Sequence, residues 1–129
     1  MTQSNVNATT GTLSSCTNSG ATSLLSPVGI QLNIGNTRAY ITNNANNTVT
    51  KCDISADTGA LVNCVNSGAT LLSGPEGIVF NSNNTVAYIV NFNSNTISIC
   101  NINSFSEALE KCSDSSASSL DFPFFMVLA

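Results

Sequence analysis

The sequence contains no histidine, and lysine and arginine account for only 3 of its 129 residues. Without histidine the chain lacks the commonest general base and a frequent metal ligand, so histidine-based catalysis and metal binding are excluded. We expect no nucleic-acid partner, because phosphate binding requires clustered cations and the basic residues are Arg38, Lys51 and Lys111. No apolar run is long enough to span a bilayer. The first ten residues lack the basic and apolar regions of a signal peptide.

Charge of either sign is scarce, because charged residues make up only 8% of the chain, compared with about a quarter in most proteins. The polarity comes instead from asparagine, serine and threonine, which are typical of turns and strand surfaces. Helical periodicity is weak throughout. The composition therefore predicts an all-β protein, and the length suffices for one domain with a modest core.

The chain is built on an ungapped repeat of 48 residues. Cysteines, prolines and an Ala-Tyr-Ile segment all return at this spacing, which chance does not explain. The recurring residues are Cys16, Cys64 and Cys112; Pro27, Pro75 and Pro123; and 39–41 with 87–89.

Each whole unit contains four strand-like segments separated by turn-rich sequence. The segments are 28–33, 37–43, 48–54 and 60–65 in the first copy, and 77–81, 85–91, 96–102 and 108–111 in the second. Segment 86–90 (VAYIV) is apolar on both faces, as in a sheet that is buried on two sides. These features predict four-stranded antiparallel β-propeller blades. We expect a partial propeller over 11–129, with units at about 11–58, 59–106 and 107–129, and a poorly ordered segment over 1–10.

The two ends of the chain align with isolated blade strands. Residues 12–18 match a fourth strand, and 122–128 match a first strand. We therefore expect an incomplete ring of about two full blades with partial strands at each end. The apolar segment from Phe122 to Leu128 is a candidate surface for protein partners or self-association, because it is exposed unless another blade or chain covers it. A fragment of a longer propeller, a degenerate remnant and an oligomerising propeller all remain open.

Four of the five cysteines lie opposite each other in predicted hairpins. Cys52 and Cys64 are symmetric about the turn at residue 58, and Cys100 and Cys112 are symmetric about residue 106. Opposed residues of an antiparallel hairpin face each other, so we predict two disulfides, with buried free thiols as the alternative. Such bridges would indicate an extracytoplasmic compartment. Cys16 would be a free thiol, or one available for pairing between molecules, because the equivalent partner position holds a serine.

The two copies resemble a known repeat. Segments 39–55 (AYITNNANNTVTKCDIS) and 87–103 (AYIVNFNSNTISICNIN) are similar to the YVTN-family β-propeller repeat, which has a Tyr-Val-Thr-Asn-like strand, an Asn-rich turn and a second strand. The segments PVGIQLN and PEGIVFN resemble its Pro-x-Gly-Ile opening strand. The resemblance implies a propeller fold. It leaves function open, because such propellers include surface-layer proteins, binding propellers and lactonase-like enzymes.

Little catalytic chemistry is visible in the sequence. We identify no catalytic, cofactor-binding or metal-ligating residue, and carboxylates are sparse for calcium. Glu76 is the one acid at the start of a predicted innermost strand, where it would face the channel of a propeller. The favoured interpretation is a non-catalytic module that serves as a binding or surface scaffold. The alternative is part of a lactonase-like hydrolytic propeller with its catalytic residues in missing blades.

Overall fold

The structure, a computed structural model, describes residues 1–121 and 123–128. Over these residues ten strands form one two-stranded and two four-stranded antiparallel sheets. The half-blade consists of β1 (Thr2–Val6) and β2 (Leu13–Asn18). Blade 1 consists of β3 (Pro27–Leu32), β4 (Arg38–Asn43), β5 (Thr48–Ile54) and β6 (Leu61–Asn66). Blade 2 consists of β7 (Pro75–Phe80), β8 (Val86–Asn91), β9 (Thr96–Ile102) and β10 (Leu109–Asp114). A short 3₁₀ helix, η1 (Asn44–Asn46), links β4 to β5.

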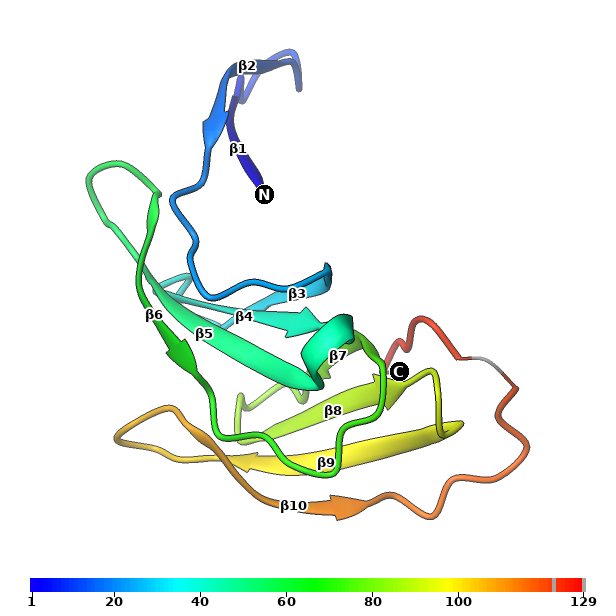
Figure 1. The fold of residues 1–129 in the computed structure, drawn as a ribbon. Coiled ribbons are helices and arrows are strands. Elements are labelled where there is room, and N and C mark those ends of the chain that lie inside the picture. The colour runs from blue at the N-terminus through cyan, green and yellow to red at the C-terminus, as the bar shows by residue number, and fades with distance from the viewer. Residues whose placement is uncertain (122, 129) are drawn as a thin grey trace.

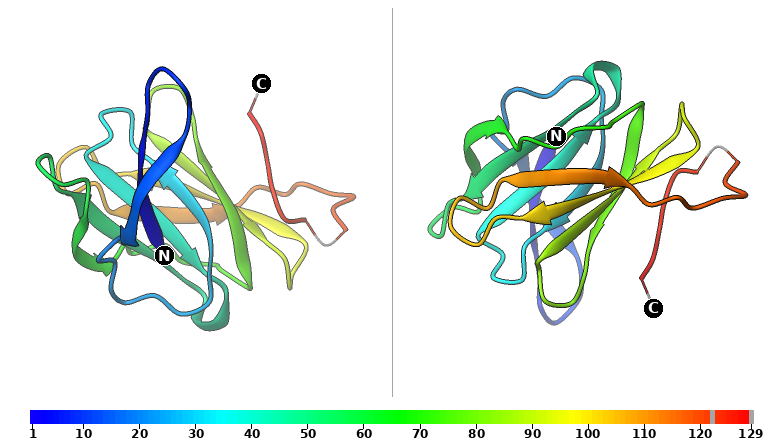
Figure 2. Two further views of the ribbon diagram at one scale, coloured as in Figure 1. Left: turned by 90° about the horizontal axis from the view of Figure 1, so that it is seen from above. Right: turned by 90° about the horizontal axis from the view of Figure 1, so that it is seen from below.

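Each blade is a meander in which consecutive strands pair, so the strand order in space is that of the chain. The first strands of the two blades, β3 and β7, contact each other. Figure 1 shows blade 1 between blade 2 and the half-blade, which projects from the rest of the molecule. The view from above in Figure 2 shows the half-blade lying across blade 1. The prediction of all-β, four-stranded propeller blades is confirmed.

Strand β4 explains why the blades stack. Its residues from Ala39 to Asn43 are all buried, so both faces of the strand are covered. Ala39 and Ile41 pack in a cluster on the half-blade side, whereas Tyr40 packs in the cluster shared with blade 2. Neighbouring side chains of a strand point to opposite faces, so one strand contributes to two cores. Each blade therefore depends on its neighbours to bury its apolar residues.

The turns repeat as faithfully as the strands. Left-handed backbone conformations recur at 48-residue intervals, including at residues other than glycine. Among these sets are Gly11, Gly59 and Glu107; Ser15, Asn63 and Lys111; Ser23, Leu71 and Ser119; and Asn47 with Asn95. The second of these sets lies at the bulge of each fourth strand, one residue before its cysteine. The repeat therefore describes backbone conformation as well as sequence.

Buried asparagines at the ends of β4 and β8 hold the loops between blades. Asn43 is fully buried, and its Nδ2 donates a hydrogen bond to Thr50 Oγ1 at 2.9 Å. Its Oδ1 accepts a hydrogen bond from the backbone N–H of Leu25 at 3.1 Å. The equivalent partners of Asn91 are Ser98 and Ser73. These asparagines are structural, because a buried amide must satisfy its donors and acceptors.

The prediction of a poorly ordered segment over 1–10 needs correction. Within it the structure has β1, which covers Thr2–Val6 and pairs with β2. Strand β1 is the third strand of a blade, 48 residues before β5, so the half-blade has a third strand as well as a fourth. Both strands are largely exposed and carry few apolar residues. The usual hydrophobic signal of a strand is therefore missing, and backbone pairing stabilises the hairpin instead.

The prediction of a first strand over 122–128 also needs correction. Phe122 lies outside the described residues, and 123–128 do not form a strand. The segment nevertheless follows the repeat locally, because the carbonyl oxygen of Phe124 accepts a hydrogen bond from the Gly77 N–H at 2.8 Å. Phe125 stands where the other copies have Gly29 and Gly77, and none of the strands among the described residues pairs with the segment. The described residues include no helix long and apolar enough to cross a membrane.

Candidate functional site

Glu76 lies in β7 at the junction of the two blades. Its side chain is buried, with 8% of the residue exposed. Its Oε1 accepts a hydrogen bond from Asn44 Nδ2 at 2.9 Å, and its backbone oxygen accepts one from Thr42 Oγ1 at 2.6 Å. Both partners belong to blade 1, so Glu76 is held by the neighbouring blade. Whether the carboxylate faces a channel stays a prediction, because the two blades do not close a ring.

Burial raises the pKa of Glu76 above its ordinary value, and the hydrogen bond from Asn44 opposes part of this increase. Desolvation disfavours the charged form of a carboxylic acid, whereas a donor to the carboxylate favours it. A carboxyl group whose pKa is shifted by burial and by a specific hydrogen-bond partner is a candidate for a functional acid or base. Among the described acids, Glu76 is therefore the strongest candidate for a catalytic group.

The blades approach closely beside Glu76. A Cβ on Gly29 would clash with the backbone oxygen of Glu76, and a Cβ on Gly77 would lie 2.7 Å from the backbone oxygen of Phe124. Glycine is therefore required at both positions, because the backbone of the neighbouring segment occupies the space of a side chain. The equivalents of Glu76 are Val28 and Phe124, which carry no acid, so this position is chemically distinctive in blade 2 alone.

The cysteines are paired as predicted. Cys52 is bonded to Cys64 and Cys100 to Cys112, with Cα–Cα distances of 4.1 and 4.0 Å. Cys16 is a free, exposed thiol. Each disulfide joins the third and fourth strands of a blade. Among the described residues, no group of three or more histidine, cysteine or acidic side chains could hold a metal ion.

Sequence reasoning did not identify Glu107, which links blade 2 to blade 1. Its Oε2 lies 2.9 Å from Arg38 Nε, and its Oε1 accepts a hydrogen bond from Asn33 Nδ2 at 3.1 Å. Its backbone oxygen accepts a hydrogen bond from the Tyr40 hydroxyl at 2.7 Å. Arg38 also pairs with Asp53 at 3.2 Å. The ion pairs and hydrogen bonds together fix the angle between the blades.

A signal for Glu107 exists in the repeat. The equivalent residues are Gly11 and Gly59, and all three positions have a left-handed backbone, with φ of +55° at Glu107. Glutamate is disfavoured in this conformation, so its presence in place of glycine indicates a compensating contact. Burial, together with the Glu107 carboxylate, raises the pKa of Tyr40, so its hydroxyl remains a donor.

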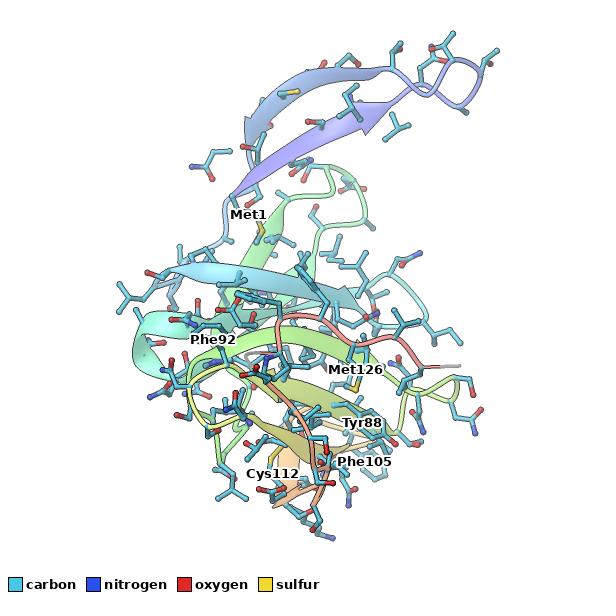
Figure 3. The ribbon with its side chains drawn as sticks, turned by 90° about the vertical axis from the view of Figure 1, so that its right-hand side faces the viewer. Met1, Tyr88, Phe92, Phe105, Cys112 and Met126 are labelled. Carbon is cyan, nitrogen blue, oxygen red and sulfur yellow. A yellow bond between two sulfur atoms is a disulfide. The ribbon has the colours of Figure 1, made fainter. Side chains whose placement is uncertain are left out.

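An open groove of about 500 Å³ lies on blade 2. It is formed by the ends of β8 and β9 and by the turn that precedes β10. Its lining residues are Thr85, Val86, Asn101, Ile102, Asn103, Ser104, Phe105 and Glu110. Figure 3 labels Phe105, which belongs to this turn, and Tyr88 of β8. The groove does not include Glu76.

Several solved structures share this fold. A structure from Bacteroides uniformis provisionally assigned as a 6-phosphogluconolactonase has a TM-score of 0.66 and 16% identity, over 90% of this chain and 36% of its own. One from Bacteroides fragilis with the same provisional assignment has a TM-score of 0.65 and 16% identity, over 96% and 35%. A periplasmic gluconolactonase of Pseudomonas aeruginosa has a TM-score of 0.64 and 12% identity, over 89% and 33%.

The chain thus spans about a third of the length of these structures. No functionally curated protein matches it in sequence. Residues 31–123, well over half of the chain, match the family described as lactonase, 7-bladed beta-propeller. This match covers blade 2 and most of blade 1, including Glu76 and both disulfides. The chain belongs to the seven-bladed lactonase β-propeller family.

Proposed function

We propose that this chain is part of a lactonase-type hydrolase, with Glu76 as an acid–base group for the opening of a sugar lactone. The family match supports this alternative over the binding scaffold favoured by the sequence. The observation that carries the proposal is the buried Glu76 carboxyl group, with its raised pKa and its fixed hydrogen bond to Asn44. The gluconolactonase name of a structural neighbour suggests the substrate class.

The chemistry requires one water and one ester bond. The Glu76 carboxylate accepts a proton from water as the water oxygen bonds to the lactone carbonyl carbon. The bond from that carbon to the ring oxygen then breaks, and the proton passes to the leaving alkoxide. The product is an open-chain hydroxy acid. A positioned general base typically contributes about 10²–10⁴-fold to such a reaction.

The test is acid release from D-glucono-1,5-lactone, measured with a pH-stat on the 129-residue chain. We expect a rate above spontaneous hydrolysis, and a decrease of about 100-fold or more in Glu76→Gln. The substitution preserves the shape and the acceptor for Asn44 but cannot take up a proton. The matched control is Glu110→Gln in β10, which should retain the activity. Equal rates for wild type and Glu76→Gln would contradict the role given to Glu76.

Other features of the earlier interpretation fit this proposal. The two disulfides and the periplasmic neighbour support an extracytoplasmic location. The buried residues Asn43 and Asn91 close the two strands that resemble the Tyr-Val-Thr-Asn repeat, which supports that repeat as a description of the blades. The segment from Pro123 to Leu128 remains a candidate for contact with a protein partner, because most of its residues are exposed.

A further inference from the structure

The pair formed by Asn44 and Glu76 has a counterpart one repeat further along the chain. We refer to the contact between blades 1 and 2 as the first junction, and to the contact between blade 2 and residues 123–128 as the second junction. Phe92 follows Asn44 by 48 residues, and Phe124 follows Glu76 by the same number. Their rings are in contact, with centroids 4.9 Å apart, and Figure 3 labels Phe92. The same two positions therefore meet at both junctions, through a hydrogen bond at the first and an aromatic contact at the second.

A third position changes from polar to apolar between the two junctions. Thr42, in β4, corresponds to Val90 in β8. At the first junction the Thr42 hydroxyl donates a hydrogen bond to the backbone oxygen of Glu76 at 2.6 Å. At the second junction the Gly77 N–H donates directly to the backbone oxygen of Phe124 at 2.8 Å. Three polar residues thus occur together at the first junction, where the next copy of the repeat has three apolar ones.

The second junction shows that the contact does not need a polar pair. Two aromatic rings stabilise such a contact by burying apolar surface. Glu76 is also buried, but burial disfavours the ionised form of its carboxyl group. A polar pair at a position where an apolar pair also serves the fold is typical of a functional site.

Asn44 is held at the place from which it donates. It is the first residue of η1, and its backbone N–H donates a hydrogen bond to the Ser26 carbonyl oxygen at 3.1 Å. Its Nδ2 binds Oε1 of Glu76, and no described residue donates to Oε2. An amide NH₂ group is only a donor, so this bond persists whether the acid is ionised or protonated. Asn44 therefore holds one oxygen of the carboxyl group and leaves the other for a proton.

No charged side chain of the described residues performs this task instead. The titratable groups on the strands packed against β7 are Arg38 and Tyr40 of β4 and Tyr88 of β8. Arg38 and Tyr40 are both bound to Glu107. The pKa of Glu76 responds to its burial and to the bond from Asn44, and to none of these groups. Asn44 is therefore the described side chain that controls this carboxyl group.

We propose that Asn44 is a positioning residue that fixes the Glu76 carboxyl group across the first junction, so that Oε2 takes the proton of the attacking water. This inference rests on the function proposed for Glu76. Blade 2 supplies the acid–base group and blade 1 supplies its orientation, so the site is formed by the contact between the two blades.

The test compares Asn44→Leu with wild type in the hydrolysis of D-glucono-1,5-lactone as a function of pH. Leucine has nearly the shape of asparagine but has no donor. Without the donor the protonated form of Glu76 is favoured, and the group acts as a base only when it is ionised. The acid limb of the pH profile should therefore move to higher pH. We expect kcat to fall about tenfold at neutral pH and KM to change little, because Asn44 acts through Glu76.

A matched control and a second measurement accompany the kinetics. Asn46→Leu makes the same change in the same turn, where Asn46 Oδ1 accepts a hydrogen bond from the Thr48 hydroxyl, and it should keep the wild-type profile. In protein labelled with ¹³C at the glutamate carboxyl groups, the NMR signal that is absent from Glu76→Gln reports the titration of Glu76. Its midpoint should lie at higher pH in Asn44→Leu and stay unchanged in Asn46→Leu.

The outcomes separate this inference from the function on which it rests. A wild-type chain no faster than spontaneous hydrolysis would overturn the proposed function, and the role of Asn44 with it. If hydrolysis requires Glu76 but Asn44→Leu keeps the wild-type rate and profile, only the positioning role is wrong. Slower hydrolysis with an unchanged acid limb and an unchanged carboxyl titration would also contradict it, because only a structural role would remain. If circular dichroism shows that Asn44→Leu is unfolded, Asn44→Ala provides the same comparison.

Discussion

The Ser4 hydroxyl donates a hydrogen bond to the Cys16 sulfur at 2.9 Å, at the position where both whole blades carry a disulfide. Ser4 is the 48-residue equivalent of Cys52 and Cys100. The half-blade thus has the geometry of the disulfide site but lacks the second sulfur. This relationship explains why Cys16 is the odd cysteine of the five.

We predict that Ser4→Cys forms a third disulfide with Cys16. Thiol titration of the unreduced protein should then give no free thiol, compared with one in the wild type. The new bridge should protect the amides of β1 and β2 from hydrogen exchange, by up to about 3 kcal/mol for a loop of this length. Gln3→Cys is the control and should give two free thiols, because residue 3 faces Thr58 in blade 1. A free thiol remaining in oxidised Ser4→Cys would contradict the expected geometry.

Tyr40→Phe should destabilise the chain by about 1 kcal/mol, whereas Tyr88→Phe should leave the stability of the monomer nearly unchanged. The two residues are equivalent in the repeat, but the Tyr40 hydroxyl donates to the Glu107 carbonyl and no described residue accepts from Tyr88. Loss of one hydrogen bond typically costs about 0.5–1.5 kcal/mol. Urea unfolding at a protein concentration that gives monomers measures both values. Equal effects of the two substitutions would be the contrary result.

Two substitutions of Glu107 should separate its contacts from its backbone strain. Glu107→Ala loses the ion pair with Arg38 and the bond from Asn33 but keeps a side chain at positive φ, so we expect a loss of about 1–2 kcal/mol. Glu107→Gly loses the same contacts but relieves the left-handed conformation. It should be about 1 kcal/mol more stable than Glu107→Ala. Equal unfolding midpoints would mean that the position is not strained.

The stability of the fold should depend on pH through Glu76. Its pKa is raised in the folded state above the ordinary value of 4.5, so the folded protein binds the proton more tightly than the unfolded chain. Stability from this group is therefore present below about pH 4.5 and is lost as the pH rises through the folded pKa. Relative to wild type, Glu76→Gln should gain stability across that window. Unfolding midpoints from pH 4 to pH 8 measure the difference, and a constant difference would contradict the prediction.

The repeat made the two whole blades predictable. The segments expected at 48–54 and 96–102 are β5 and β9 without any change of bounds, and the other strands shift by one or a few residues. The disulfides followed from the same periodicity, because opposed hairpin positions are set by the turn at their centre. The third strand of the half-blade was missed, because Ser4 replaces the cysteine that marks it and β1 has few apolar residues.

The candidate site was only partly predictable. Glu76 stood out in the sequence as an acid at the start of an innermost strand, but its burial and its bond from Asn44 depend on how blade 1 packs against blade 2. Glu107 illustrates the same limit. Its place in a glycine position of the repeat indicates a compensating contact, but its partners Arg38 and Asn33 lie about seventy residues earlier and are identified only by the packing of the blades.

The sequence alone determined the period, the strands, the turns and the cysteine pairs, because these depend on local conformation and on contacts within one hairpin. The tertiary structure decided how the blades contact each other and which acid is buried. Those properties depend on contacts between residues that are distant in the chain, such as Tyr40 with Glu107 and Thr42 with Glu76. Equivalent residues such as Tyr40 and Tyr88 therefore differ in their contacts, because among the described residues only the hydroxyl of Tyr40 has an acceptor, in the next blade.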